Sequence, residues 1–236
     1  LDTYRVYHAI KNAKIYADFV IIIIHGGNEY NPIPTPRTVS RYRLFAEFGA
    51  NAVIGMHPHC MQGFELYNHI PIVYSTGNFL FSKPTAEDPR DSWYHGYLPF
   101  ISFKKGEPAS LEVIPYHFNK ECTLISPLKE DIKIKMLSYL DEISRPIQDE
   151  KLLTEFFMGW CVISGTRHGR YIVYKPEYVD EQEFPTDHPL LALRNMHTCE
   201  AANEMMTAFF KMLADGKLNI GKSMVDEIKR LQKMPV

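Results

Sequence analysis

The sequence predicts an α/β fold with a mostly helical C-terminal part. The run Phe19–Ile24 is apolar without polar alternation, which is typical of a strand covered on both faces. A helix and a second strand follow through Met56 with short links, which predicts a right-handed parallel βαβ unit. After about Cys122 the spacing of apolar residues becomes helical. The length of 236 residues, 45% of them hydrophobic, is enough to bury a core without disulfides.

The first half of the chain predicts these elements in order. Asp2 or Thr3 caps a helix that runs to Ala17, and the strand Phe19–Ile24 follows it. Thr35 and Pro36 begin a second helix that Gly49 ends, and the strand Asn51–Met56 comes next. Further short strands are expected as an antiparallel continuation of the sheet, around a loop from Lys83 to Tyr97, at Ile70–Ser75, Phe79–Phe81, Phe100–Phe103 and Leu111–Tyr116.

The second half is predicted to be helical. We expect helices at Glu130–Ile143, Glu150–Cys161, Pro189–Ala214 and Ser223–Lys233. We place a first domain at residues 1–121 and a helical region at residues 122–236, which could also pack on the same domain. A methionine-rich face is expected to belong to the core; it comprises Met196, Met205, Met206 and Met212.

Composition excludes several classes of protein. The net charge of −2 and the scattered basic residues argue against nucleic acid as a partner. The longest apolar run is far shorter than the roughly 20 residues that span a bilayer, so we expect no transmembrane helix. Four widely spaced cysteines predict neither a zinc knuckle nor a disulfide framework.

Three histidines follow the two predicted parallel strands. His25 comes directly after the first strand, and His57 and His59 come after the second. Because ligands bind beyond the carboxyl ends of such strands, we expect the three imidazoles to share one site. Pro58 keeps His57 and His59 extended, so both side chains point the same way. Imidazole suits zinc, iron, nickel and copper, and a site that includes carboxylates would also take manganese.

Other interpretations of these residues stay open. The histidines could be ordinary core or surface residues that coincide at strand ends. Glu29 could be a general base, an acceptor that orients an imidazole, or a solvated loop charge. Three histidines could hold one ion, or be half of a two-metal site.

Three motifs resemble the bacterial poly-γ-glutamate capsule-biosynthesis family of the CapA type. They are DFVIIIIHGGNEY at residues 18–30, FGANAVIGMHPHCMQGFELYN at residues 48–68 and IPIVYSTGNFLF at residues 70–81. The resemblance implies a calcineurin-like metallophosphatase fold, in which a four-layer β-sandwich flanked by helices carries a two-metal centre. Gly26 and Met56 depart from residues common in the family.

The resemblance also implies roles for individual residues. His25, His57 and His59 match metal ligands, and His25 and Glu29 are candidate catalytic residues. Asn78 and Tyr30 are expected beside the ligands. Two divalent ions, manganese, iron or zinc, are implied. The family's Gly-Asp and Asn motifs have no counterpart before Asp18, so the chain resembles the C-terminal part of such a protein, with the N-terminal portion missing.

Two functions follow from the resemblance. The first is a metal-dependent hydrolase that acts on a phosphoester or on a γ-glutamyl polymer. The second is a non-enzymatic component that binds a polyanionic polymer during capsule synthesis or export. The cell location stays open between a bacterial envelope process and the cytoplasm.

Overall fold

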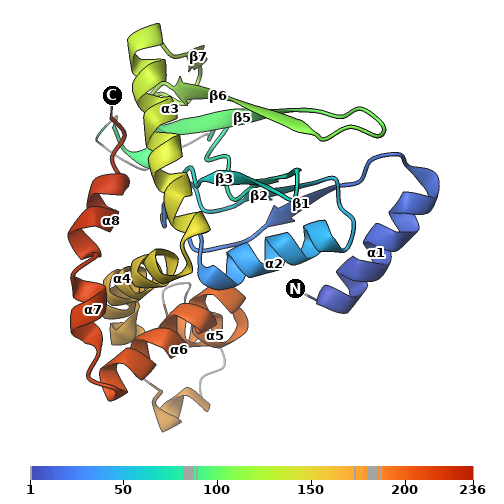
Figure 1. The fold of residues 1–236 in the computed structure, drawn as a ribbon. Helices are drawn as coiled ribbons and strands as arrows, with labels where there is room; N and C mark the ends of the chain where they lie inside the picture. Colours follow the sequence, from blue (N-terminus) through green and yellow to red (C-terminus); the bar gives the residue numbers. More distant parts are fainter. Residues whose placement is uncertain are drawn as a thin grey trace. The chain divides into compact units, whose positions relative to one another are not determined.

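The computed structural model describes residues 2–81, 88, 90–172, 174–179, 185 and 188–235. These residues are mixed α/β, which confirms the predicted class at that level (Figure 1). They form two compact units: unit 1 contains residues 1–153 and 229–236, and unit 2 contains residues 154–228. Unit 1 extends past the boundary predicted between residues 121 and 122, and that domain assignment stays a prediction.

Unit 1 contains a four-stranded mixed sheet with the strand order β1-β2-β4-β3. β1 pairs in parallel with β2, β2 in parallel with β4, and β3 antiparallel with β4. The helix α2 connects β1 to β2, so the predicted βαβ unit is confirmed. The elements are α1 (Thr3–Tyr16), β1 (Ile21–His25), α2 (Pro36–Glu47), β2 (Ala52–Met56), β3 (Phe64–Tyr67) and β4 (Ile70–Val73).

The ends of the first two helices follow the predicted caps. The Asp2 carboxylate accepts a hydrogen bond from the Arg5 amide at the start of α1. The Thr35 hydroxyl accepts one from the Thr38 amide at the start of α2, where Pro36 occupies the first turn. α2 packs on the sheet through Tyr42, whose ring stacks on that of Tyr74 with centroids 5.4 Å apart.

The interpretation of β1 as a strand covered on both faces is wrong. β1 is an edge strand, and Ile21 and Ile23 are 46% and 65% exposed. Continuous apolar composition predicted a strand correctly, but composition does not say whether a strand lies at the centre or at the edge of its sheet.

A second, three-stranded antiparallel sheet follows, with the order β5-β6-β7. The expected continuation of the first sheet is confirmed for Ile70–Ser75, part of which joins that sheet as β4, and is wrong for Phe100–Phe103 and Leu111–Tyr116, which belong to the second sheet. Among the described residues, an isolated bridge pairs Gly77 with Gly96 at the start of this region. The predicted strand Phe79–Phe81 does not form, and part of the predicted loop, residues 83–87 and 89, lies outside the described residues. The elements are η1 (Ser92–Tyr94), β5 (His95–Ser102), β6 (Ser110–Phe118) and β7 (Ile125–Pro127).

The helix α3 (Glu130–Ser144) completes the core of unit 1. It packs on β3 and β6, and its residues Met136, Leu140 and Ile143 are fully buried. The Tyr139 hydroxyl donates a hydrogen bond to the Leu231 carbonyl, 2.7 Å away, which ties the last residues of the chain to this helix. η2 (Arg145–Gln148) and the first residues of α4 (Glu150–His168) follow.

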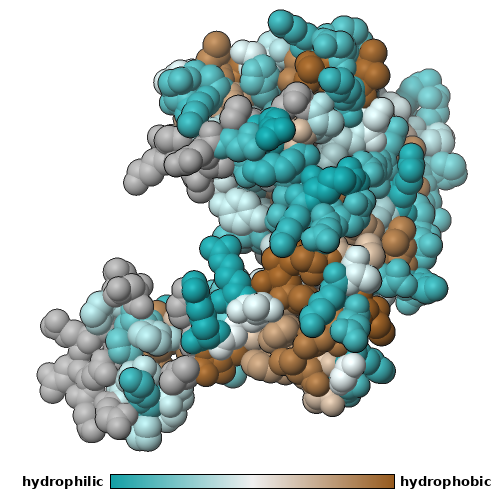
Figure 2. Space-filling view, turned by 90° about the vertical axis from the view of Figure 1, so that its left-hand side faces the viewer, coloured by the Kyte–Doolittle hydropathy of each residue, from teal (hydrophilic) through white to brown (hydrophobic). Residues whose placement is uncertain are grey.

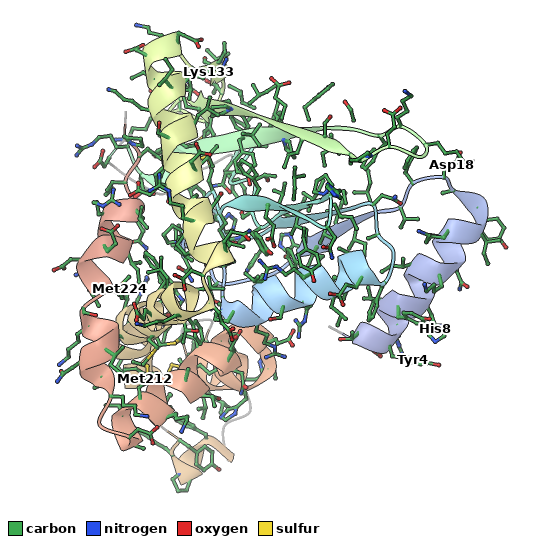
Figure 3. All side chains as sticks on the ribbon, in the orientation of Figure 1. Tyr4, His8, Asp18, Lys133, Met212 and Met224 are labelled. Atoms are coloured by element: carbon green, nitrogen blue, oxygen red, sulfur yellow. The ribbon has the colours of Figure 1, made fainter. Side chains whose placement is uncertain are left out.

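Unit 2 is helical. The predicted helix Pro189–Ala214 is two helices, because Cys199 between them has an extended backbone. The four methionines of the predicted core face are all buried, and Figure 3 shows Met212 among these helices. The elements are the rest of α4, η3 (Gly169–Tyr171), η4 (Pro176–Val179), α5 (Pro189–Thr198), α6 (Glu200–Ala214), α7 (Leu218–Lys222) and most of α8 (Val225–Leu231).

Surface properties agree with the composition. Hydrophilic residues cover much of the face shown in Figure 2, and hydrophobic residues gather in its lower middle part. No helix in the described part of the chain is long and apolar enough to cross a membrane. The four cysteines are free thiols in this structure, and three of them, Cys60, Cys122 and Cys161, are buried.

Candidate metal centre

The ends of β1 and β2 form the candidate site. The register pairs His25 with Met56, the residue before His57. His25 and His57 are therefore neighbours at the carboxyl ends of the two strands. Two backbone hydrogen bonds fix the loops: the Gly26 amide donates to Met56 (3.0 Å) and the Tyr30 amide donates to Pro58 (2.7 Å). The predicted convergence of the two strand ends is confirmed.

The backbone of these loops is strained, and the extended conformation predicted for His57 and His59 is wrong, because both residues have positive φ. Among the described residues, six non-glycine residues have positive φ, and three of them lie here: Tyr30 (62°), His57 (105°) and His59 (58°). Each such conformation costs about 1–3 kcal/mol and persists only where the surroundings enforce it. Strain of this kind is concentrated at functional sites.

His59 is oriented by Asn78. The Asn78 side-chain amide donates to the Trp93 carbonyl (3.0 Å), so its oxygen is the atom that faces His59 Nδ1 at 2.9 Å. An amide oxygen only accepts, so Nδ1 of His59 carries the proton. The other ring nitrogen, Nε2, therefore has a free lone pair, which is the form a metal ligand needs.

His57 lies between two partners. Its Nδ1 is 3.1 Å from His25 Nε2, and its Nε2 is 3.7 Å from a Glu29 carboxylate oxygen. Burial is the main reason that the pKa of His57 is lowered; Glu29 opposes this shift, while His25 and His59 add to it. A neutral imidazole is favoured at this position, and neutral imidazole is the ligand form.

Three side chains offer ligand atoms to a common point. The ligand atoms of Glu29, His57 and His59 all lie within 4.8 Å of one another. Ligands of a single ion at about 2.1 Å are separated by roughly 3–4 Å, so a small contraction brings them into range. Two imidazoles and a carboxylate fit zinc, iron or manganese.

The predicted residues meet in a different grouping from the one expected. Glu29, predicted as a catalytic or orienting residue, belongs to the possible ligand cluster, whereas His25 contacts His57 from outside it. The roles of His25 as ligand and of His25 and Glu29 in catalysis stay predictions. Asn78 lies beside His59, as does the Tyr30 ring, 6.3 Å away between centroids.

Two aromatic residues next to His59 were not predicted. Trp93 lies 5.1 Å from His59 and Phe81 5.0 Å, measured between ring centroids. Phe81 is the last residue of the motif at residues 70–81, where it is not assigned a role, and Trp93 lies outside the three motifs. The Asp91 carboxylate, which caps η1 by accepting from the Trp93 amide at 3.0 Å, is the nearest sequence signal.

Sheet and site together define an α/β protein with a possible His/Glu metal cluster at parallel strand ends. Residues 1–83 match the family described as bacterial capsule synthesis protein PGA_cap. The chain is 32% identical over 136 residues to the PGA biosynthesis protein CapA of Bacillus subtilis (strain 168), which is 58% of this chain and 34% of that protein. It is 39% identical over 106 residues to the capsule biosynthesis protein CapA of Bacillus anthracis, which is 44% of this chain and 24% of that protein.

These matches confirm the resemblance derived from the three motifs. The segment that carries the histidines is a segment of the CapA-type family of capsule-synthesis proteins. The chain covers about a third of the length of the first relative and about a quarter of the second.

Proposed function

We propose that this chain carries the metal-binding part of a metal-dependent hydrolase in bacterial capsule synthesis. The observation that carries the proposal is the cluster of Glu29, His57 and His59 at the ends of β1 and β2. We place the fold within the metallophosphatase-like class, in which helices flank a four-layer β-sandwich and two ions are bound. The substrate is a phosphoester or a γ-glutamyl polymer.

A divalent cation in such a site polarises the bond to be cleaved and lowers the pKa of water. Glu29, His57 and His59 would hold the cation. Asn78 keeps the proton of His59 on Nδ1 and leaves Nε2 for the ligand bond. His25 fixes the proton of His57 in the same way, because its Nε2 accepts a hydrogen bond from Nδ1–H of His57. Nε2 of His57, the nitrogen that faces Glu29, is then left for the ligand bond.

Metal content tests the first part of this proposal. Equilibrium dialysis against Mn²⁺ or Zn²⁺, followed by elemental analysis, is expected to find bound metal in the wild-type protein and none in the double variant His57→Ala/His59→Ala. His8→Ala is the matched control, because His8 lies on the exposed side of α1 beside Tyr4 (Figure 3). Equal metal content in the double variant and the wild type would refute the ligand assignment.

Hydrolysis tests the second part. The metal-loaded protein is expected to hydrolyse p-nitrophenyl phosphate or poly-γ-glutamate in a reaction that needs the added metal and is lost in His57→Ala. Bound metal without turnover of either compound would contradict a hydrolase. That result would favour the alternative, a component that binds the polymer without cleaving it.

A further inference from the structure

Aromatic rings from three separate segments surround the imidazole of His59. Phe81 meets it edge to face, with ring centroids 5.0 Å apart and planes at 84°. Trp93 lies 5.1 Å away at 30°, and Tyr30 lies 6.3 Å away at 33°. Phe81 and Tyr30 also contact the Trp93 ring, at 4.9 Å and 6.2 Å. The three rings therefore form one continuous aromatic wall beside His59.

One ring of the aromatic wall, that of Trp93, is buried, and another, that of Phe81, is accessible. Trp93 is only 5% exposed and is packed in a small core with Tyr94, Phe118 and Cys122. Phe81 is 39% exposed, so solvent and ligands reach its ring. The backbone of Tyr30 is held in place by the Gln232 side chain, which donates a hydrogen bond to the Tyr30 carbonyl (2.8 Å).

The aromatic wall lies next to His59, a proposed metal ligand, and so beside the place where the reacting group of a substrate would bind. The Phe81 ring contacts the imidazole whose Nε2 would hold the metal, so a group bound to that metal would lie near this ring. An aromatic side chain there attracts flat rings, through stacking or through edge contacts. A γ-glutamyl chain is aliphatic and has no ring to offer, whereas the organic group of many phosphoesters is a ring.

We propose that Phe81, Trp93 and Tyr30 form a subsite for a ring in the organic group of a phosphoester substrate. This inference rests on the proposed metal-dependent function. It narrows the substrate to phosphoesters whose ester oxygen carries a ring. The ring is aromatic, which stacks on an aromatic side chain or meets it edge to face, or it is a saccharide, whose axial C–H groups pack on an aromatic face.

Calorimetric titration of the Mn²⁺-loaded protein with two phosphonates tests the subsite. Phenylphosphonate is expected to bind about tenfold more tightly than methylphosphonate, since one aromatic contact supplies roughly that factor. Phe81→Ala is expected to reduce the ratio to near one. Phe79→Ala is the matched control: Phe79 is also exposed, but its ring contacts Tyr116 at 5.6 Å. Equal affinity for the two phosphonates in the wild type would overturn the proposal. So would an equal loss of the preference for phenylphosphonate in Phe81→Ala and Phe79→Ala.

Two further arms complete the test. Glucose 1-phosphate replaces phenylphosphonate to distinguish the sources of the ring: preference for the sugar in the wild type, lost in Phe81→Ala, assigns a saccharide. Metal content is measured on the same samples. Metal that binds normally while both phosphonates bind alike overturns the ring subsite alone, whereas absence of metal refutes the proposed function itself.

Discussion

At the scale of single residues, Asn78 does the most to prepare the site. Its side chain joins His59 to the Trp93 carbonyl, and its own carbonyl accepts from the Tyr116 hydroxyl (2.9 Å). It is 4% exposed, so these partners are shielded from water. The tautomer of His59 is therefore decided by a residue that does not itself offer a ligand.

Asn78→Ala is expected to weaken metal affinity by about 10–100-fold, because the imidazole loses the acceptor that fixes its proton. Calorimetric titration with Zn²⁺ measures the change, and a thermal melt checks that the variant is folded. Asn51→Ala is a suitable control, since Asn51 caps the Val20 amide (2.9 Å) and has no contact with His59 in the described structure. Unchanged affinity in Asn78→Ala would show that the tautomer is set in another way.

His95 is expected to make the stability of the fold depend on pH. It is 3% exposed, and burial lowers its pKa from 6.5 to about 4, although Nδ1 donates to the Asp91 carbonyl at 3.1 Å. The unfolded chain thus binds a proton that the folded chain does not between pH 6.5 and 4. The contribution of His95 to the free energy of unfolding is therefore fully present above pH 6.5. It is lost as the pH falls from 6.5 to 4, by about 3 kcal/mol in all.

Urea unfolding at several pH values between 7.5 and 4.5 measures this effect. His95→Asn keeps a donor for the Asp91 carbonyl but does not titrate, so the difference between wild type and variant isolates His95. A difference that does not change with pH would contradict the expected shift.

At the scale of elements, a buried polar cluster holds together α2, β3, η2 and Tyr74, the residue that follows β4. Arg43 donates two hydrogen bonds to the Glu65 carboxylate, both at 2.8 Å, and one to the Ile147 carbonyl at 3.0 Å. Tyr74 and Gln148 donate to the same carboxylate at 2.6 Å and 2.7 Å. Burial alone raises the pKa of Glu65, but the hydrogen bonds from Arg43, Tyr74 and Gln148 outweigh it and leave this pKa lowered.

Glu65→Gln is expected to lower the free energy of unfolding by about 3 kcal/mol, because Arg43 then lacks its buried counter-charge. Glu47→Gln is the control: Glu47 accepts from Tyr67 at 2.7 Å in an exposed position and is expected to cost less than about 1 kcal/mol. Chemical denaturation measures both. Equal losses would mean that the cluster contributes no more than a surface contact.

Elements with a local signal could be predicted from the sequence, and elements without one could not. Asp2 and Thr35 cap α1 and α2 as expected, and the apolar composition of β1 and β2 predicted both strands. β3 and β7 are short and were missed, while Phe79–Phe81 has strand-like residues but no partner strand. Pairing is decided by residues distant in the sequence, which composition does not reveal.

The same reason applies to the site. The approach of His25 to His57 and His59 could be predicted because His25 ends β1 and the other two lie within three residues of the end of β2. The approach of Trp93 and Phe81 to His59 could not, since it depends on how Asn78 holds the Trp93 carbonyl across 15 residues of chain. The direct contact of His25 with His57 could not be predicted either, because it depends on side-chain geometry.

At the scale of the whole molecule, the two tryptophans report on different parts. Trp93 lies in unit 1 and Trp160 in unit 2, and both are buried. The indole N–H of each has no hydrogen-bond partner in the described structure, so replacement by Phe removes no such bond. Single-tryptophan variants therefore allow each unit to be followed by fluorescence.

Trp160→Phe and Trp93→Phe are expected to give different urea midpoints, because each reporter senses the core of its own unit. We expect the signal of Trp160 in unit 2 to change at the lower urea concentration, since a smaller unit buries less apolar surface. Circular dichroism of both variants checks that the substitutions leave the fold intact. Coincident transitions would show that the two units unfold as one.

The exposed edge of β1 has a consequence for the behaviour of the protein in solution. Ile21 and Ile23 present β-branched side chains beside an outer edge that pairs with no other strand of the described sheet. Natural edge strands usually carry lysine, proline or a bulge that prevents another strand from adding. β1 has none of these from Ile21 to Ile24, so strands of other molecules can pair with its free edge. We therefore expect the protein to aggregate faster as its concentration rises.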